Sequence, residues 1–249
     1  MSKGPRVTAI EALACDAGWR NYHFVKLSTD EGIVGWSEFD EGFGAPGVTA
    51  AIERLSGRVV GKNAFQHERI YAELFAATRP AAGGVVALAL GAIENALLDV
   101  KAKALGVPCY ELLGGKIRDR VRVYNGGVRF PMGGYDPEDY AESTRQMLAS
   151  PEGFTIVKQP IGFHSPMKRE VPNFFYGEAR PAGGLHGALD RGALTERGLK
   201  HFIACVEAMK EVADDAVGLA LDCGPGFSPN DALKVARALE PLNLMWLED

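Results

Sequence analysis

GLALDCGPGFSPNDALKVARALEPLNLMWLED, residues 218–249, is the stretch that decides the fold class, because it predicts a strand, a helix and a second strand in direct succession. Ser228 stands at the N-cap of the helix, Pro229 at its first position and Asp231 at the capping-box position. Apolar strands joined by a helix predict a right-handed βαβ unit and a parallel sheet covered on both faces. The segment therefore predicts an α/β domain.

The same alternation extends back along the chain to residue 120. A polar stretch rich in glycine and proline, residues 162–193, interrupts it and is too long for a routine connection. The predicted strands are 120–128, 154–161, 217–224 and 244–249, and the predicted helices are 135–150, 195–213 and 228–242.

The first part of the chain has a different pattern. Residues 6–39 predict a meander of three strands, and helical patterns follow near 48–60, 64–77 and 84–105. The last helix is expected to stop at Gly106, before Pro108. We therefore predict an α+β domain over residues 1–117, followed by the α/β domain over residues 118–249.

Composition excludes several classes of function. The chain has 249 residues, is 47% hydrophobic and 24% charged, and carries a net charge of -5, so we expect no nucleic-acid partner. No apolar run approaches the roughly 18 residues of a membrane span, and the first residues lack the apolar core of a secretory signal. We therefore expect no membrane partner. The four cysteines are far apart without CxxC spacing, which favours a reducing, cytoplasmic location.

Polar residues follow the predicted parallel strands where chemistry is expected, because function gathers at the carboxyl ends of such strands. Carboxylates there are hard ligands suited to Mg²⁺, and a lysine beside a divalent cation can act as a base. A single acid at a strand end is more often a helix cap or a solvated residue. The combination on successive strands favours function: Tyr124, Asn125, Lys158, Asp222, Glu248 and Asp249.

Two other patterns in the sequence suggest alternative sites. Gly224 and Gly226 follow a strand and precede a helix, as in a dinucleotide-binding turn, but Pro229 stands at the third glycine position and the fingerprint fails. The histidines 164, 186 and 201 have no activated serine or cysteine in any motif. His201 lies within a predicted helix and is expected to be structural or exposed.

Three segments, 29–39, 92–124 and 218–249, together resemble the mandelate racemase/muconate lactonizing enzyme family of the enolase superfamily. The resemblance implies an α+β capping domain, the first half of a modified TIM barrel and Mg²⁺ at the barrel mouth. It implies that Asp222 and Glu248 are the first two metal ligands and that Asp249 is only a neighbour. Lys158 matches the first lysine of the family's Lys-x-Lys strand end, but Pro160 replaces the second, which is often the base.

The resemblance also implies substrate contacts outside the metal segment. Residues 14–24 resemble the family's mobile loop over the substrate, and residues 38–47 resemble a second such loop. His164 and Lys158 are the candidate catalytic residues. The candidate substrate-binding residues are Trp19, Arg20, Tyr22, Asn125, Arg169 and His186. For the candidate residues in these loops and in the 162–193 stretch, the alternative interpretation is that they are ordinary polar loop residues.

The family's shared chemistry removes the proton next to a carboxylate, and the leading prediction is an Mg²⁺-dependent acid-sugar dehydratase. A racemase, epimerase or cycloisomerase is the runner-up, and a non-catalytic protein on the same scaffold is the third reading. Only four of eight barrel strands are expected here, without a third metal ligand, so we expect the chain to be the front part of a longer enzyme and inactive by itself. We expect the full-length protein to be a homo-oligomer that acts on a small carboxylate.

Overall fold

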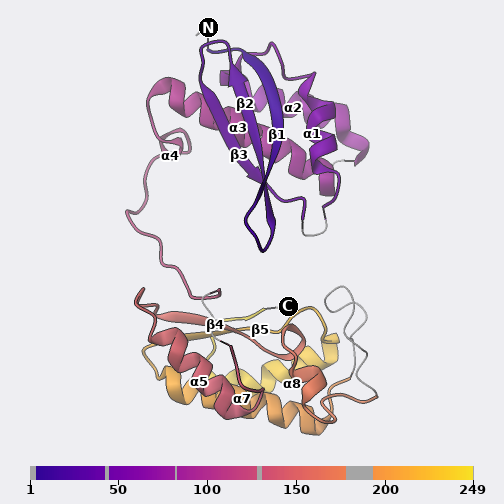
Figure 1. The fold of residues 1–249 in the computed structure, drawn as a ribbon, viewed down its shortest axis with the longest axis vertical. Helices are drawn as coiled ribbons and strands as arrows, with labels where there is room; N and C mark the ends of the chain where they lie inside the picture. Colours follow the sequence, from indigo (N-terminus) through magenta and orange to yellow (C-terminus); the bar gives the residue numbers. More distant parts are fainter. Residues whose placement is uncertain (1–3, 43–44, 82, 128–130, 178–192, 249) are drawn as a thin grey trace. The chain divides into compact units, whose positions relative to one another are not determined.

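The computed structural model describes residues 4–42, 45–81, 83–127, 131–177 and 193–248 (Figure 1). The chain divides into two compact units, Met1–Asp119 and Arg120–Asp249. Each unit has its own hydrophobic core.

Unit 1 is an antiparallel three-stranded sheet with helices packed on it, as the predicted α+β domain requires. The core forms where Val25 and Leu27 of the sheet meet Ile93 and Leu97 of the longest helix, all of them buried. The strands are β1 (Val7–Asp16), β2 (Asn21–Thr29) and β3 (Val34–Phe39) in that order, and the helices are α1 (Val48–Ser56), η1 (Ala64–Gln66), α2 (His67–Thr78), η2 (Arg79–Ala81), α3 (Gly84–Leu105) and α4 (Cys109–Leu112).

The packing of β3 on α3 is unusually close. The backbone N–H of Trp36 donates to Asp99 Oδ2 at 2.8 Å, and Lys103 Nζ donates to the Val34 carbonyl at 2.9 Å. Gly35 lies between these contacts, and a Cβ there would stand 2.2 Å from the Ala96 carbonyl oxygen of α3. The strand therefore rests directly on the backbone of the helix.

Unit 2 contains a parallel sheet in the order β4 (Ile156–Pro160), β5 (Gly218–Asp222) and β6 (Leu247–Glu248). The helices are α5 (Pro137–Leu148), η3 (Gly162–His164), α6 (Met167–Glu170), α7 (Glu196–Ala213), α8 (Pro229–Leu239) and η4 (Glu240–Leu242). The helix starts follow the sequence signals: Asp136 forms a capping box, and the side chains of Thr195 and Ser228 accept N-cap hydrogen bonds.

The helices α5, α7 and α8 lie on one side of this sheet (Figure 1). The expectation that helices cover both faces is wrong for the described residues. Right-handed crossovers that advance in one direction, from β4 to β5 to β6, place each helix on the same face. This arrangement is that of a barrel wall, although the described strands form an open sheet and not a closed barrel.

The predicted strand over 120–128 is wrong within the described residues, apart from one parallel bridge between Asn125 and Val157. Val121 and Val123 are 72% and 63% exposed, so this segment gains little from burial. The predicted last strand is also shorter than expected. Its pairing nevertheless begins before β6, because Met245 N–H donates to the Leu219 carbonyl at 2.8 Å.

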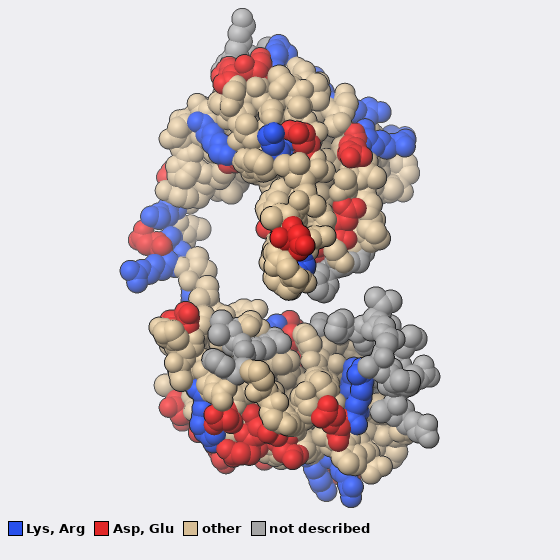
Figure 2. Space-filling view, viewed as in Figure 1, with Lys and Arg blue, Asp and Glu red and all other residues tan. Residues whose placement is uncertain are grey.

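Lys and Arg side chains are interspersed with Asp and Glu on the face of each unit shown in Figure 2. In the described part of the chain, we find no helix that is both long enough and apolar enough to cross a membrane.

A buried thiol in unit 2 gives a prediction about alkaline stability. Burial, reinforced by Asp136 and Asp139, raises the pKa of Cys205 from 9.0 to about 12. Above about pH 9 the unfolded chain therefore loses a proton that the folded chain keeps, and stability falls by up to about 1.4 kcal/mol per pH unit until the folded thiol ionises. We expect Cys205→Ala to reduce this loss between pH 9 and 12 in urea denaturation, whereas the exposed Cys15→Ala should leave it unchanged.

Candidate metal and catalytic site

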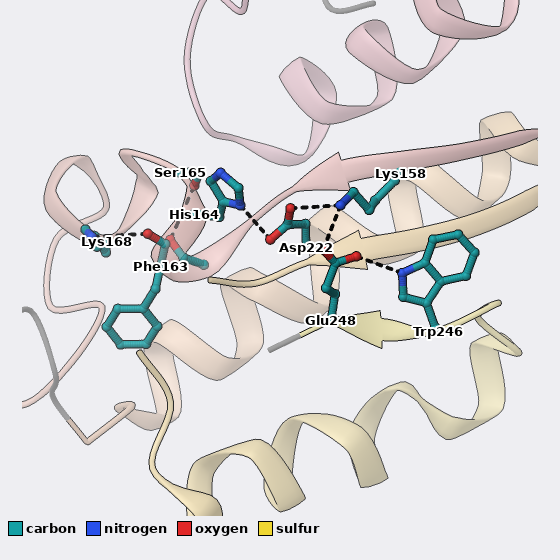
Figure 3. Close-up of polar contacts among 9 residues, drawn as sticks. Lys158, Phe163, His164, Ser165, Lys168, Asp222, Trp246 and Glu248 are labelled. Atoms are coloured by element: carbon teal, nitrogen blue, oxygen red, sulfur yellow. Dashed lines mark hydrogen bonds and ion pairs between the residues drawn. The ribbon is translucent and has the colours of Figure 1, made fainter. Parts of the chain in front are cut away.

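The carboxyl ends of β4, β5 and β6 lie side by side and carry the predicted polar residues (Figure 3). In the sheet register, Pro160 is level with Asp222, which is level with Glu248. Lys158 lies two residues before Pro160, on the same face of β4. Gln159 points the opposite way and donates to Ser143 and Thr144 of α5, both at 3.1 Å. The lysine is therefore on the sheet face away from the helices.

Lys158 holds the two predicted metal ligands together. Its Nζ lies 3.1 Å from Asp222 Oδ2 and 2.8 Å from Glu248 Oε1. Lys158 is 8% exposed and Asp222 is 4% exposed, so both charges are largely removed from water. Charges buried in this way are stable only when paired. The sequence predicted the meeting of these three residues, and the structure brings them together.

The pairing determines the ionisation of all three groups. For Asp222, burial favours the neutral acid, but hydrogen bonds from His164 and Lys158 outweigh it and lower the pKa. For Lys158, burial favours the neutral amine, but hydrogen bonds to Glu248 and Asp222 outweigh it and raise the pKa. Hydrogen bonds from Lys158 and Trp246 lower the pKa of Glu248. The cluster is therefore one ammonium between two carboxylates.

His164 joins the cluster from the turn that follows β4. Its Nδ1 lies 2.5 Å from Asp222 Oδ1, and its side chain is 37% exposed. Its backbone N–H donates to the carbonyls of Ile161 at 3.1 Å and Cys223 at 2.9 Å. The candidate catalytic histidine is thus fixed through its side chain to Asp222, the last residue of β5, and through its main chain to Cys223, the next residue, while part of its ring stays open to solvent.

The two glycines that resembled a dinucleotide-binding turn allow this histidine turn to pack. A Cβ on Gly224, which has φ +68°, would lie 2.9 Å from the backbone nitrogen of His164. A Cβ on Gly226 would lie 2.1 Å from the Phe163 ring. The spacing Gly-x-Gly therefore serves close contact between two loops, a role that only the tertiary structure reveals.

Buried polar side chains support the same turn and were missed by the sequence reasoning. The Tyr140 hydroxyl of α5 donates to Ser165 Oγ at 3.1 Å, next to His164. Lys168 is 7% exposed, and its Nζ donates to the Phe163 carbonyl at 3.1 Å. No sequence motif marks either residue, because both lie on helices, Tyr140 on α5 and Lys168 on α6, and neither stands at a strand end.

Trp246 is the other site residue that the sequence reasoning missed. Its indole Nε1–H donates to Glu248 Oε2 at 3.0 Å, and its ring meets the Tyr124 ring edge to face at 5.1 Å. Lys158 Nζ lies 5.8 Å from the centre of the Tyr124 ring. Trp246 and Glu248 are two residues apart at a strand end, so their side chains lie on the same face of the strand. This spacing is the sequence signal from which the pair could have been predicted.

The remaining predictions in unit 2 have different outcomes. Asn125 is 1% exposed and pairs through its backbone with β4, as its N–H donates to the Ile156 carbonyl at 2.9 Å. Arg169 is exposed on α6. His186 and Asp249 lie outside the described residues. His201 is structural, since its Nε2 lies 2.8 Å from the Tyr135 carbonyl.

The predicted substrate residues of unit 1 lie at the tip of the β1–β2 hairpin. The Arg20 guanidinium is 4.7 Å from the centre of the Trp19 ring and 4.2 Å from that of Tyr22. Trp19 is 70% exposed. A pocket of about 390 Å³ lies between the hairpin and the second predicted loop, and its lining is Arg20, Asn21, His23, Asp40, Glu41 and Gly42. The two loops are therefore neighbours, and their role in substrate binding remains a prediction.

The donor chemistry of the cluster fits part of a Mg²⁺ site. Asp222 and Glu248 already converge on one cation, the Lys158 ammonium, and their oxygens are the hard ligands that Mg²⁺ prefers. Within the described ranges, no group of three or more His, Cys, Asp or Glu side chains is arranged to hold a metal. The cluster therefore offers two candidate metal ligands, Asp222 and Glu248.

Two family models match the chain. The model of the mandelate racemase/muconate lactonizing enzyme N-terminal domain matches residues 3–114, and the enolase C-terminal domain-like model matches residues 139–249. The chain belongs to the mandelate racemase/muconate lactonizing enzyme family of the enolase superfamily.

Similar proteins carry dehydratase and epimerase names. The chain is 31% identical to a D-xylonate dehydratase of Haloferax volcanii, over 98% of this chain and 53% of that protein. It is 29% identical to a D-galactonate dehydratase of Variovorax paradoxus, over 91% of this chain and 51% of that protein. A crystal structure of a candidate L-alanine-DL-glutamate epimerase from Burkholderia xenovorans, bound to magnesium and fumarate, is 43% identical with a TM-score of 0.77, covering 97% of this chain and 60% of that one. The chain thus spans about half the length of the curated relatives it matches.

Proposed function

We propose that the full-length protein is an Mg²⁺-dependent hydro-lyase that removes water from an acid sugar. The observation that carries the proposal is the meeting of Asp222, Glu248 and Lys158 at the carboxyl edge of the parallel sheet, with His164 on Asp222. Names of similar proteins, D-xylonate dehydratase and D-galactonate dehydratase, support the substrate class.

Asp222 and Glu248 would hold the ion. When bound, Mg²⁺ supplies positive charge that offsets the negative charge gained by a carboxylate substrate as its α-proton leaves. Lys158 can accept that proton only as the neutral amine. Its ion pairs with Asp222 and Glu248 favour the ammonium form. The neutral amine is therefore favoured only when another cation neutralises these two carboxylates.

His164 is the candidate acid for the departing β-hydroxyl. Its contact with Asp222 fixes the ring orientation, and its partly exposed edge is open to a ligand. Dehydration needs such a proton donor because hydroxide is a poor leaving group. Pro160 stands at the position of the family's second lysine, level with Asp222. Because proline has no basic side chain, this position supplies no base.

An epimerase is the second candidate function. The 43% identical Burkholderia structure carries an epimerase name, and epimerisation shares the first proton transfer but needs no acid for a hydroxyl. The product separates the two: a 2-keto-3-deoxy acid for dehydration and a stereoisomer for epimerisation.

The test incubates the full-length protein with a panel of acid sugars, with Mg²⁺ and with EDTA, and assays 2-keto-3-deoxy acids. We expect Mg²⁺-dependent product that falls by about 10²-fold or more in Glu248→Gln. Glu240→Gln, an exposed acid on η4, is the matched control and should keep full activity. If no acid sugar yields a 2-keto-3-deoxy acid, the dehydratase proposal fails, and a stereoisomer would favour the epimerase.

A further inference from the structure

We propose that Trp246 is a positioning residue that sets which oxygen of Glu248 faces the bound cation. The inference rests on the proposed metal site and adds a residue to it. The indole N–H of Trp246 donates to Glu248 Oε2, and the Lys158 ammonium donates to Glu248 Oε1 (Figure 3). The two oxygens of the Glu248 carboxylate therefore have separate partners.

Glu248 needs such a partner. Its side chain is 37% exposed, far more than the 6% of Asp222, and a glutamate has more rotatable bonds than an aspartate. An exposed glutamate at the last strand would otherwise sample several orientations. A hydrogen bond to one oxygen limits the rotation of the carboxylate and leaves the other oxygen directed at the cation.

Trp246 is itself held in place. Its carbonyl accepts a hydrogen bond from the Leu221 N–H of β5 at 3.2 Å, and its ring meets the Tyr124 ring with an interplanar angle of 73°. Edge-to-face pairs of this kind are favourable and fix the relative ring planes. A backbone contact with β5 and a ring contact with Tyr124 therefore orient the indole N–H.

The environment of Trp246 is not that of a core tryptophan. Its neighbours Leu244 and Leu247 pack against the hydrophobic core of unit 2, whereas Trp246 faces the polar cluster. An indole N–H is a donor without an acceptor lone pair, so it can engage only the carboxylate and cannot compete as a ligand for a cation. These properties suit a second-layer residue that orients a ligand.

The experiment measures Mn²⁺ binding to the full-length protein by electron paramagnetic resonance, with Mn²⁺ as a substitute for Mg²⁺ at oxygen ligands. We expect Trp246→Phe, which keeps an aromatic ring but loses the N–H, to weaken Mn²⁺ binding by about 10-fold or more. Trp36→Phe, in the sheet of unit 1, is the matched control and should leave Mn²⁺ affinity unchanged.

A double-mutant cycle separates positioning from packing. In a Glu248→Ala background there is no carboxylate to orient, so Trp246→Phe should cause no further loss of Mn²⁺ affinity. If Trp246→Phe does not fold, Tyr124→Leu replaces it, with a smaller loss that also depends on Glu248. An unchanged affinity, or an equal loss in both backgrounds, would overturn the positioning role alone. Absence of Mn²⁺ binding by the wild type would overturn the proposed metal site, and the positioning role with it.

Discussion

Asp222→Asn is expected to lower kcat/KM of the full-length protein for its acid sugar by about 10³-fold or more. Asp222 accepts from Lys158 at 3.1 Å and faces His164 at 2.5 Å, so it connects the proposed base, acid and metal. The amide keeps the shape but loses the negative charge, and it cannot hold a divalent cation as a carboxylate does. The measurement is steady-state kinetics with Mg²⁺, with circular dichroism to confirm that the variant folds.

The matched control is Asp215→Asn, which removes an exposed carboxylate in the connection before β5. We expect wild-type kinetics from this control. A folded Asp222→Asn variant that retained more than about a tenth of the activity would contradict the role proposed for Asp222, because a lost metal ligand should cost far more.

Gly35→Ala is expected to destabilise unit 1 by about 3 kcal/mol. The new Cβ would stand 2.2 Å from the Ala96 carbonyl oxygen and 2.6 Å from a methyl group of Val100. Backbone cannot yield as a flexible side chain can, so β3 must move away from α3. Amide hydrogen exchange of β2 and β3 reports this change locally, and we expect faster exchange there than in the wild type.

Gly91→Ala is the matched control on α3 itself. A Cβ at Gly91 meets nothing within 4 Å, and alanine is the better helix former by about 1 kcal/mol. We therefore expect slower exchange in unit 1, a change of opposite sign to that of Gly35→Ala. Equal effects from both substitutions would show that the β3–α3 approach is not the reason for glycine at residue 35.

Local signals explain why much of the fold could be predicted. The predicted helix over 84–105 is α3 (Gly84–Leu105), and it ends at Gly106 with φ 68° because a left-handed C-cap suits glycine. Thr195 and Ser228 mark the starts of α7 and α8 in the same way. Helix caps and hydrophobic periodicity depend on residues that are close together in the chain, so both can be predicted from the local sequence.

The prediction failed where a segment's state depends on neighbours. Residues 120–123 alternate arginine with valine and belong to the predicted strand over 120–128, yet among the described residues of that segment only Asn125 forms a bridge. β-Structure requires a partner and a surface to cover the apolar side chains, and Val121 and Val123 remain exposed. Strand propensity alone could not supply either.

The sequence by itself determined the order of elements, the α+β and α/β character of the two units and the placement of Lys158, Asp222 and Glu248 at strand ends, because strand ends and caps are local properties. Tertiary structure alone decided that His164 reaches Asp222, that Gly226 makes room for Phe163 and that the Tyr124 ring meets the Trp246 ring. These contacts join segments whose spacing carries no shared period, so they exist only once the parallel sheet has brought the loops together.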